Sequence, residues 1–129
     1  MTRATITRPE DVKVVPKPWG EERWLAHTDR YAGKILILKK GHRLSLQYHE
    51  IKDETLRVLD GSLELQLGPD VEHLQTHNLE AGAVFHVSPG TLHRMIAIAD
   101  CRLLEVSTNH LDDVVRLEDR YGREGTSTP

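Results

Sequence analysis

Short apolar segments separated by glycine and proline at regular intervals are the feature that most constrains the fold of this chain. Leu63, Leu65 and Leu67 alternate with polar residues, which is the pattern of a half-buried β-strand. Asp60-Gly61 stands between two such segments and predicts a hairpin turn. The other turn residues recur at similar spacing, at Gly41, Gly68-Pro69, Gly82 and Pro89-Gly90. This spacing predicts an all-β sandwich or small barrel.

The length and composition of the chain fit a single domain with one hydrophobic core. It has 129 residues, of which 38% are hydrophobic and 29% are charged, as in globular proteins. We expect an N-terminal arm over 1–18, which three prolines interrupt, then one barrel domain over 19–123 and a flexible tail over 124–129. The segment HLDDVVRLEDRYG, at 110–122, is expected to form a short helix or turn.

Charge and cysteine content exclude several classes of protein. The net charge of −3 leaves no basic surplus for phosphate-backbone contacts, so we expect no nucleic-acid partner. The single cysteine, Cys101, cannot form an internal disulfide, and no pattern of an activating base surrounds it. The N-terminus lacks the apolar core of a signal peptide, and the longest apolar run is too short to cross a bilayer. A cytoplasmic protein without a membrane partner is the expectation.

Four polar residues have a spacing that suits metal binding. Gln47 and His49 are two apart in a predicted strand, so their side chains project from the same face. Glu54 begins the next strand after a short connection, and His93 follows the Pro-Gly turn of another hairpin. Oxygen and imidazole groups on rigid strand ends suit a divalent first-row metal. The competing interpretation is four unrelated surface residues on an ordinary barrel.

This spacing resembles the two motifs of the cupin superfamily. The segment from Gly41 to Gly61 resembles the first motif, with Gln47 at the position of its first histidine. The segment GAVFHVSPGTLH, at 82–93, resembles the second motif, with Ser88 in place of proline. Ala97 stands where that motif ends in asparagine. The resemblance implies a double-stranded β-helix, or jelly-roll, barrel.

Three further segments resemble the cupin domain of type II mannose-6-phosphate isomerases. They are KPWGEERW at 17–24, YAGKILILKKGHRLSLQYH at 31–49 and DDVVRLEDRYGR at 112–123. The resemblance implies one divalent ion per chain, Zn, Mn, Fe, Co or Ni, and these ligands: Gln47, His49, Glu54 and His93. Relatives with this domain usually carry a sugar-nucleotide pyrophosphorylase domain, for which these 129 residues leave no room.

The chain departs from that family immediately after the first histidine ligand. Where the family has two further histidines, this sequence has Glu50 and Ile51, and Lys52 replaces an arginine. Lysine keeps the positive charge but loses the planar fork that binds phosphate through two hydrogen bonds. The family's His-Trp pair after the glutamate is Thr55-Leu56 here. These changes weaken the assignment of mannose 6-phosphate as the substrate.

Aldose–ketose isomerisation requires a base near C2 and stabilisation of an enediolate. Candidate proton-transfer residues are Lys34, Lys52 and Glu50, among which the sequence does not choose. Arg116 and Arg123 are candidates for binding a phosphate, although Arg116 could instead pair with a neighbouring aspartate. The expected ligand is a phosphorylated or nucleotide-linked sugar. A homodimer is expected by analogy with other cupins.

Three functions remain compatible with the sequence. The first is a metal-dependent sugar-phosphate isomerase or epimerase. The second is a metal-dependent cupin enzyme of another class, such as an iron dioxygenase, which oxygen uptake would distinguish. The third is a sugar-binding or regulatory cupin without turnover, and the replaced histidines favour it.

Overall fold

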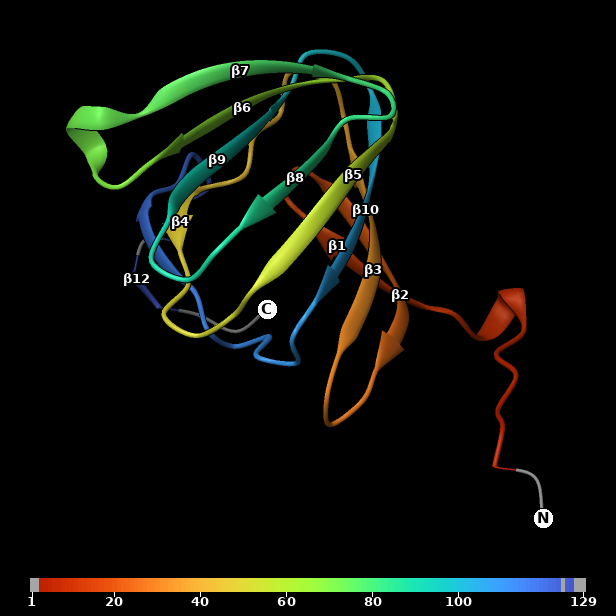
Figure 1. The fold of residues 1–129 in the computed structure, drawn as a ribbon. Helices are drawn as coiled ribbons and strands as arrows, with labels where there is room; N and C mark the ends of the chain where they lie inside the picture. Colours follow the sequence, from red (N-terminus) through yellow and green to blue (C-terminus); the bar gives the residue numbers. More distant parts are fainter. Residues whose placement is uncertain (1–2, 124, 127–129) are drawn as a thin grey trace.

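The chain folds into two antiparallel sheets that face each other and form a barrel (Figure 1). The computed structural model describes residues 3–123 and 125–126. Sheet A has the order β1-β2-β3-β10-β5-β8, with β1 Lys13–Lys17, β2 Gly20–His27, β3 Ala32–Leu38, β10 Cys101–Ser107, β5 Glu54–Asp60 and β8 Val84–Val87. Sheet B has the order β12-β11-β4-β9-β6-β7, with β12 Gly125–Thr126, β11 Val115–Glu118, β4 Leu46–Tyr48, β9 Leu92–Ala97, β6 Ser62–Gly68 and β7 Gln75–Glu80. The predicted all-β jelly-roll barrel is confirmed.

The β5–β6 hairpin shows how the sequence pattern produces the local structure. Leu63 and Leu65 of β6 are buried, while Glu64 between them is partly exposed. Gly61 forms the turn with a φ of 83°, in the left-handed region that glycine adopts without strain. A Cβ atom at this position would lie 2.2 Å from the carbonyl oxygen of Asp100. The turn therefore needs glycine both for its conformation and for its close approach to the β9–β10 connection.

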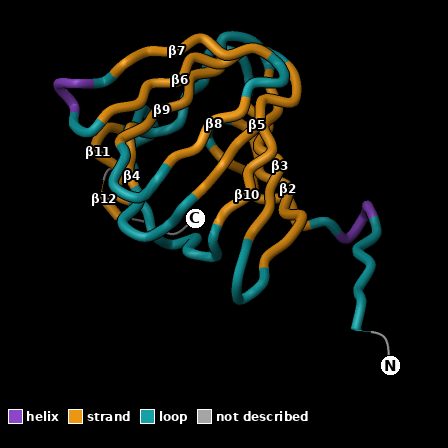
Figure 2. The backbone as a smooth tube through the Cα atoms, viewed as in Figure 1, coloured by secondary structure: helices purple, strands orange, loops and turns teal. Residues whose placement is uncertain are grey.

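The N-terminal arm divides into a projecting part and an edge strand. Residues 3–12 include a single 3-10 turn, η1 (Pro9–Asp11), and extend away from the barrel (Figures 1 and 2). Residues Lys13–Lys17 then form β1, which pairs with β2 at the edge of sheet A. An irregular or edge-strand arm was the expected arrangement for a segment with three prolines.

The C-terminal segment forms a turn and a strand, not a helix. Residues 111–112 make the turn, and Val115–Glu118 form β11, which pairs with β4 in sheet B. Of the two predicted forms the turn is present, and the strand was not anticipated. Gly125–Thr126 pair with β11 as β12, whereas the rest of the predicted tail, 124 and 127–129, lies outside the described residues.

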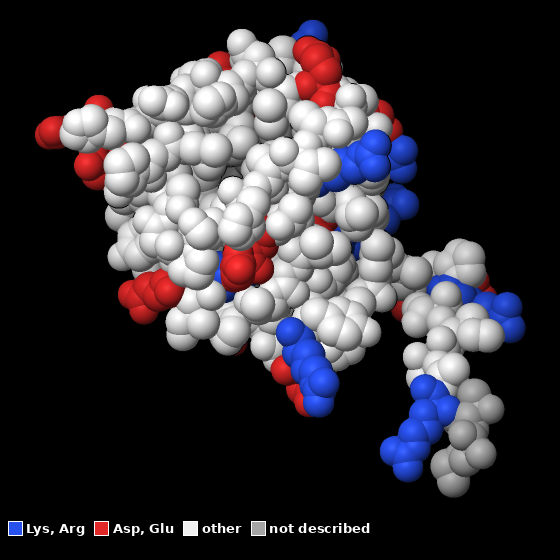
Figure 3. All heavy atoms as spheres, viewed as in Figure 1, with Lys and Arg blue, Asp and Glu red and all other residues white. Residues whose placement is uncertain are grey.

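The interior separates into an apolar core and a polar cavity. The core contains leucines from both sheets together with Trp19, Phe85 and Met95. Ionisable side chains are also buried, and most of them line one cavity described below. On the face drawn in Figure 3, charged side chains stand in small groups around large uncharged areas. Within the described ranges, no helix combines the length and hydropathy needed to cross a membrane.

Candidate metal centre

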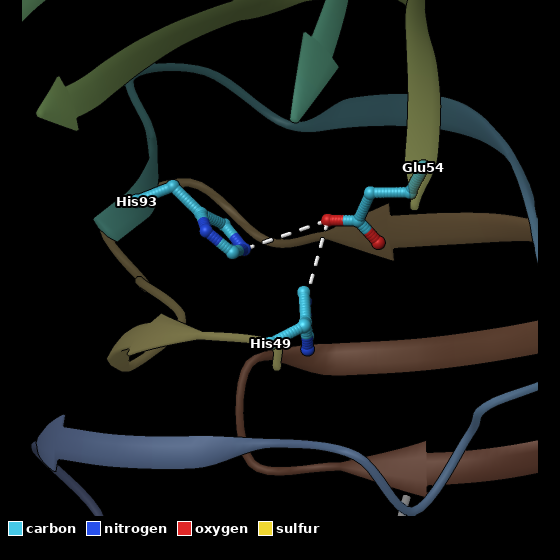
Figure 4. Close-up of side chains that lie close together, drawn as sticks. All are labelled: His49, Glu54 and His93. Atoms are coloured by element: carbon cyan, nitrogen blue, oxygen red, sulfur yellow. Dashed lines mark ion pairs between the residues drawn. The ribbon is translucent and has the colours of Figure 1, made fainter. Parts of the chain in front are cut away.

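Three side chains from both sheets converge at one end of the barrel and form what we call the ligand cluster: His49, Glu54 and His93. His49 follows β4, Glu54 is the first residue of β5, and His93 lies in β9. The Nε2 atoms of His49 and His93 lie 3.5 and 3.4 Å from Oε1 of Glu54 (Figure 4). All three residues are buried, and their potential ligand atoms lie within 4.8 Å of one another. Three of the four predicted ligands are thus side by side.

Backbone carbonyls fix the orientation of both imidazole rings. His49 Nδ1 donates to the carbonyl oxygen of Asp113, and His93 Nδ1 donates to that of Thr91 at 3.0 Å. A carbonyl oxygen only accepts, so each Nδ1 carries a proton, and in the neutral imidazole Nε2 then holds a free lone pair. Both lone pairs therefore face the carboxylate of Glu54. This is the arrangement by which proteins orient histidine ligands toward a metal.

The electrostatics of the ligand cluster favour the protonation states that bind a cation. Burial lowers the pKa of His93 and keeps its imidazole neutral, although Glu54 opposes the shift. Burial also works against the charged form of Glu54, but opposing effects, of which the charge of Lys52 is the largest, hold the pKa of Glu54 below its usual range. Nε2 of His93 is buried without a hydrogen-bond partner among residues 3–123 and 125–126. A buried acceptor of this kind, beside a carboxylate, fits a divalent metal.

Gln47 lies in the same row of residues as His93. Its Cα pairs with His93 across β4 and β9, and with Arg116 on the other side across β11. Paired residues on neighbouring strands share a face of the sheet, so all three side chains point the same way. Gln47 lines the cavity together with His49 and Glu54. The side chain of Gln47 therefore faces the same cavity as His49 and Glu54.

A buried ion-pair network surrounds the carboxylate of Glu54. Lys52 Nζ lies 3.0 Å from Oε2 of Glu54 and 3.3 Å from Oε2 of Glu105. Burial opposes the charge on Lys52, but Glu105 and Glu54 outweigh it and raise the pKa of Lys52 above its ordinary value. Burial raises the pKa of Glu105, while Lys52 opposes this shift. Lys52 is therefore held as an ammonium ion and cannot accept a proton while both carboxylates hold it.

A polar cavity that opens to solvent lies next to the ligand cluster. Of the predicted catalytic and substrate-binding residues, Lys34, Lys52, Arg116 and Arg123 line it. Lys34 is buried and lies 3.1 Å from Oε1 of Glu22. Glu50 does not line the cavity, because its side chain is exposed on the loop before β5. The structure therefore brings together every predicted site residue except Glu50.

The positions that depart from the family mostly lie away from the cavity. Glu50 is exposed, and Ile51 is 60% exposed. Leu56 is fully buried in the apolar core, and Thr55 is outside the cavity lining. Only Lys52 points into the cavity. The positions at which the family has these histidines therefore do not contribute to the polar lining of this chain's cavity.

Several residues of the site were not predicted. Asp113 fixes the loop before β5, since its carboxylate accepts hydrogen bonds from the backbone N–H groups of Glu50, Ile51 and Lys52 at 2.6–3.0 Å. Glu22, Glu105, Lys17 and Ser45 also line the cavity. For Ser45 a signal was available, because it stands two residues before Gln47 and so shares its face. For Lys17, Glu22 and Glu105 the sequence carries no signal that separates them from solvent-exposed strand residues.

Curated proteins of bacteria are similar to this chain in sequence. The chain is 33% identical over 116 residues to "Mannose-1-phosphate guanylyltransferase 2" of Escherichia coli O157:H7, covering 84% of this chain and 22% of that protein. It is 32% identical over 114 residues to "Xanthan biosynthesis protein XanB" of Xanthomonas campestris pv. campestris (strain B100), covering 84% and 23%. The chain thus spans less than a quarter of the length of these relatives.

Solved structures share the fold at lower identity. KdgF from Halomonas sp. superposes with a TM-score of 0.71 at 18% identity, covering 82% of this chain and 95% of that one. An RmlC-like cupin from Shewanella frigidimarina NCIMB 400 gives a TM-score of 0.71 at 15% identity, covering 82% and 91%. The family described as "Mannose-6-phosphate isomerase C-terminal" matches residues 7–119, nearly the whole described chain. The chain therefore has the fold of this RmlC-like cupin and belongs to the mannose-6-phosphate isomerase C-terminal family.

Proposed function

We propose that this chain is a metal-dependent isomerase or epimerase acting on a sugar phosphate related to mannose 6-phosphate. The observation that carries the proposal is the buried, unpartnered Nε2 of His93 beside His49 and Glu54, among the described residues. His49, Glu54 and His93 would hold the metal, with Gln47 as a further ligand. A bound divalent metal would act as a Lewis acid that polarises the sugar oxygens.

The residues around the ligand cluster support proton transfer at a bound sugar. Lys52 Nζ stands 3.0 Å from Glu54, so a sugar oxygen near the ligands would lie within its reach. As an ammonium ion, Lys52 donates a hydrogen bond or a proton to that oxygen. The acceptor for the C2 proton is then a carboxylate, and Glu105 is the buried one beside Lys52. Lys34, which is paired with Glu22, lies next to Glu105 across β3 and β10.

The test follows a proton at C2 of the sugar. Purified protein is loaded in turn with manganese, zinc, cobalt or iron, and mannose 6-phosphate in heavy water is followed by proton NMR. We expect loss of the C2 proton signal and formation of fructose 6-phosphate, both dependent on the metal. His49→Ala should abolish both, whereas the exposed residue Glu50 should tolerate Glu50→Gln. No exchange with any of these metals would exclude mannose 6-phosphate as the substrate.

A further inference from the structure

Arg116 is a buried cation in the same row of side chains as the candidate metal ligands. It lies in β11 and is 8% exposed. Its Cα pairs with Gln47, which pairs with His93, so Arg116 and His93 are two strands apart on one face of sheet B. With a strand spacing of about 4.8 Å, their Cα atoms are about 10 Å apart. A small molecule in the cavity can therefore contact both residues.

Among residues 3–123 and 125–126, no carboxylate forms an ion pair with the guanidinium of Arg116. Its Nε and Nη1 atoms are buried without a hydrogen-bond partner in the described part of the chain. Asp119, a nearby carboxylate, instead binds Arg123, with 2.9 Å between Nε and Oδ2. A buried charge without a partner is costly, and proteins retain such groups where a ligand completes them. The sequence also allowed Arg116 to form an ion pair with Asp112, Asp113 or Asp119. No such ion pair is present among the described residues.

Lys17, at the end of β1, adds a second cation to the same cavity. Among residues 3–123 and 125–126, its side chain forms no ion pair. Burial lowers the pKa of Lys17, and the charges of Lys34, Arg123 and Arg116 lower it further, against the opposing effect of Glu22. Like charges that gather in a cavity repel one another, and an anion relieves that repulsion.

Ser45 supplies an uncharged donor to the same cavity. It is 1% exposed, it lines the cavity, and its Oγ has no hydrogen-bond partner in the described residues. The carboxylates of the cavity are already occupied, because Glu22 pairs with Lys34 while Glu54 and Glu105 pair with Lys52. The donors left without partners are thus a guanidinium, an ammonium and a hydroxyl, and an oxyanion accepts from all three.

We propose that Lys17, Ser45 and Arg116 form an anion subsite, which binds the phosphate or carboxylate group of the small molecule whose other end reaches His49, Glu54 and His93. The subsite shares its cavity with the proposed metal centre, and it depends on the proposed function in no other way. Arg123 supports it indirectly, because Asp119 forms its ion pair with Arg123, and none with Arg116 among the described residues. Phosphate and carboxylate share the chemistry that the subsite recognises, and the experiment separates them.

The test measures binding to metal-depleted protein, so that it does not depend on turnover. Isothermal titration compares mannose 6-phosphate, glucuronate and uncharged mannose. We expect one of the two anionic sugars to bind at least about tenfold more tightly than mannose, as a charge-assisted hydrogen bond implies. The tighter of the two identifies the group as phosphate or carboxylate. Equal affinity for all three sugars would overturn the proposal.

Variants distinguish the anion subsite from general electrostatics. Arg116→Gln and Lys17→Gln should each weaken binding of the preferred anion about tenfold, and Ser45→Ala should weaken it about fivefold. Arg102→Gln is the matched control, because Arg102 pairs with Asp60 on the outer surface and the variant changes the net charge equally. An equal loss in Arg102→Gln would refute the proposal.

Ser45→Ala leaves the net charge unchanged, so it keeps the test decisive if Arg116→Gln does not fold. Anion binding without C2 exchange would reject the isomerase and retain the subsite.

Discussion

The ligand cluster and the anion subsite meet at one cavity, but the charges of the first have partners and Arg116 of the second has none among the described residues. Glu54 of the ligand cluster contacts two histidines and Lys52, and Lys52 is shared with Glu105. Arg116 of the anion subsite has two buried nitrogens without a partner among the described residues. The first arrangement stabilises the folded chain while it presents lone pairs to a cation. The second costs stability and presents donors to an anion, as functional sites often do.

Removing the charge of Glu54 should have the largest effect. We expect Glu54→Gln to lower the free energy of unfolding by about 3 kcal/mol, because Lys52 then remains buried with one carboxylate instead of two. Urea denaturation of metal-depleted protein measures this change, and calorimetry should show that metal binding is lost. Glu80→Gln makes the same chemical change on an exposed residue of β7 and serves as the control. Equal, small effects of both variants would show that the ligand cluster is not stabilised by this network.

The loop that carries His49 and Lys52 depends on Asp113. We expect Asp113→Ala to lower the free energy of unfolding by about 2 kcal/mol, since three backbone N–H groups lose their acceptor. Metal affinity should fall about 10- to 100-fold, as it does when groups that orient ligands are removed. Denaturation and metal titration measure the two effects. Asp112→Ala, at the exposed neighbouring position, should change neither.

Removing the buried cation of the anion subsite should change stability in the opposite direction. We expect Arg116→Met to raise the free energy of unfolding by about 1–2 kcal/mol, because methionine fills similar space without an unpartnered charge. Arg123→Met breaks the pair with Asp119 and should lower it by about 1 kcal/mol. Thermal and urea unfolding without ligand measure both. A loss of stability in Arg116→Met would mean that Arg116 is a structural residue, and the contrast with Glu54 would disappear.

The sequence predicts the ligand cluster better than the anion subsite for a physical reason. Gln47, His49, Glu54 and His93 follow fixed spacings around turns, and turn chemistry is local. Lys17 and Glu105 face inward only because of how their strands pair, which local sequence does not reveal. Where the sequence pattern indicates a strand with one exposed face, a charged residue is normally assigned to that face.

The segment after residue 110 shows that local sequence is also an incomplete guide to secondary structure. Its closely spaced acidic and apolar residues suggested a helix or turn, but Val115–Glu118 pair with β4 as a strand. Pairing across the sheet outweighed local preference, as is common for short strands. The difference matters for the site, because only the strand places Arg116 beside Gln47.

The smallest expected effect is that of a substitution at Asp119, whose carboxylate pairs with Arg123 and not with Arg116. Burial opposes ionisation of Asp119, but hydrogen bonds from Arg123 outweigh it and hold the pKa of Asp119 below its ordinary value of 3.8. A depressed pKa in the folded state stabilises the fold above the unfolded pKa, and this stability is lost as the pH falls through the folded pKa. We therefore expect Asp119→Asn to lower the free energy of unfolding by about 1 kcal/mol near neutral pH.

The difference between wild type and Asp119→Asn should shrink as the pH falls from the ordinary pKa of 3.8, where Asp119 of the unfolded chain becomes protonated, through the lower pKa of Asp119 in the folded state. Urea unfolding at several pH values from neutral to acidic measures it, with Asp112→Asn as the exposed control. A difference that does not vary with pH would show that Asp119 acts through shape and not through charge. Arg123 would then not hold Asp119 through its charge, and their ion pair would not explain why Arg116 lacks a partner.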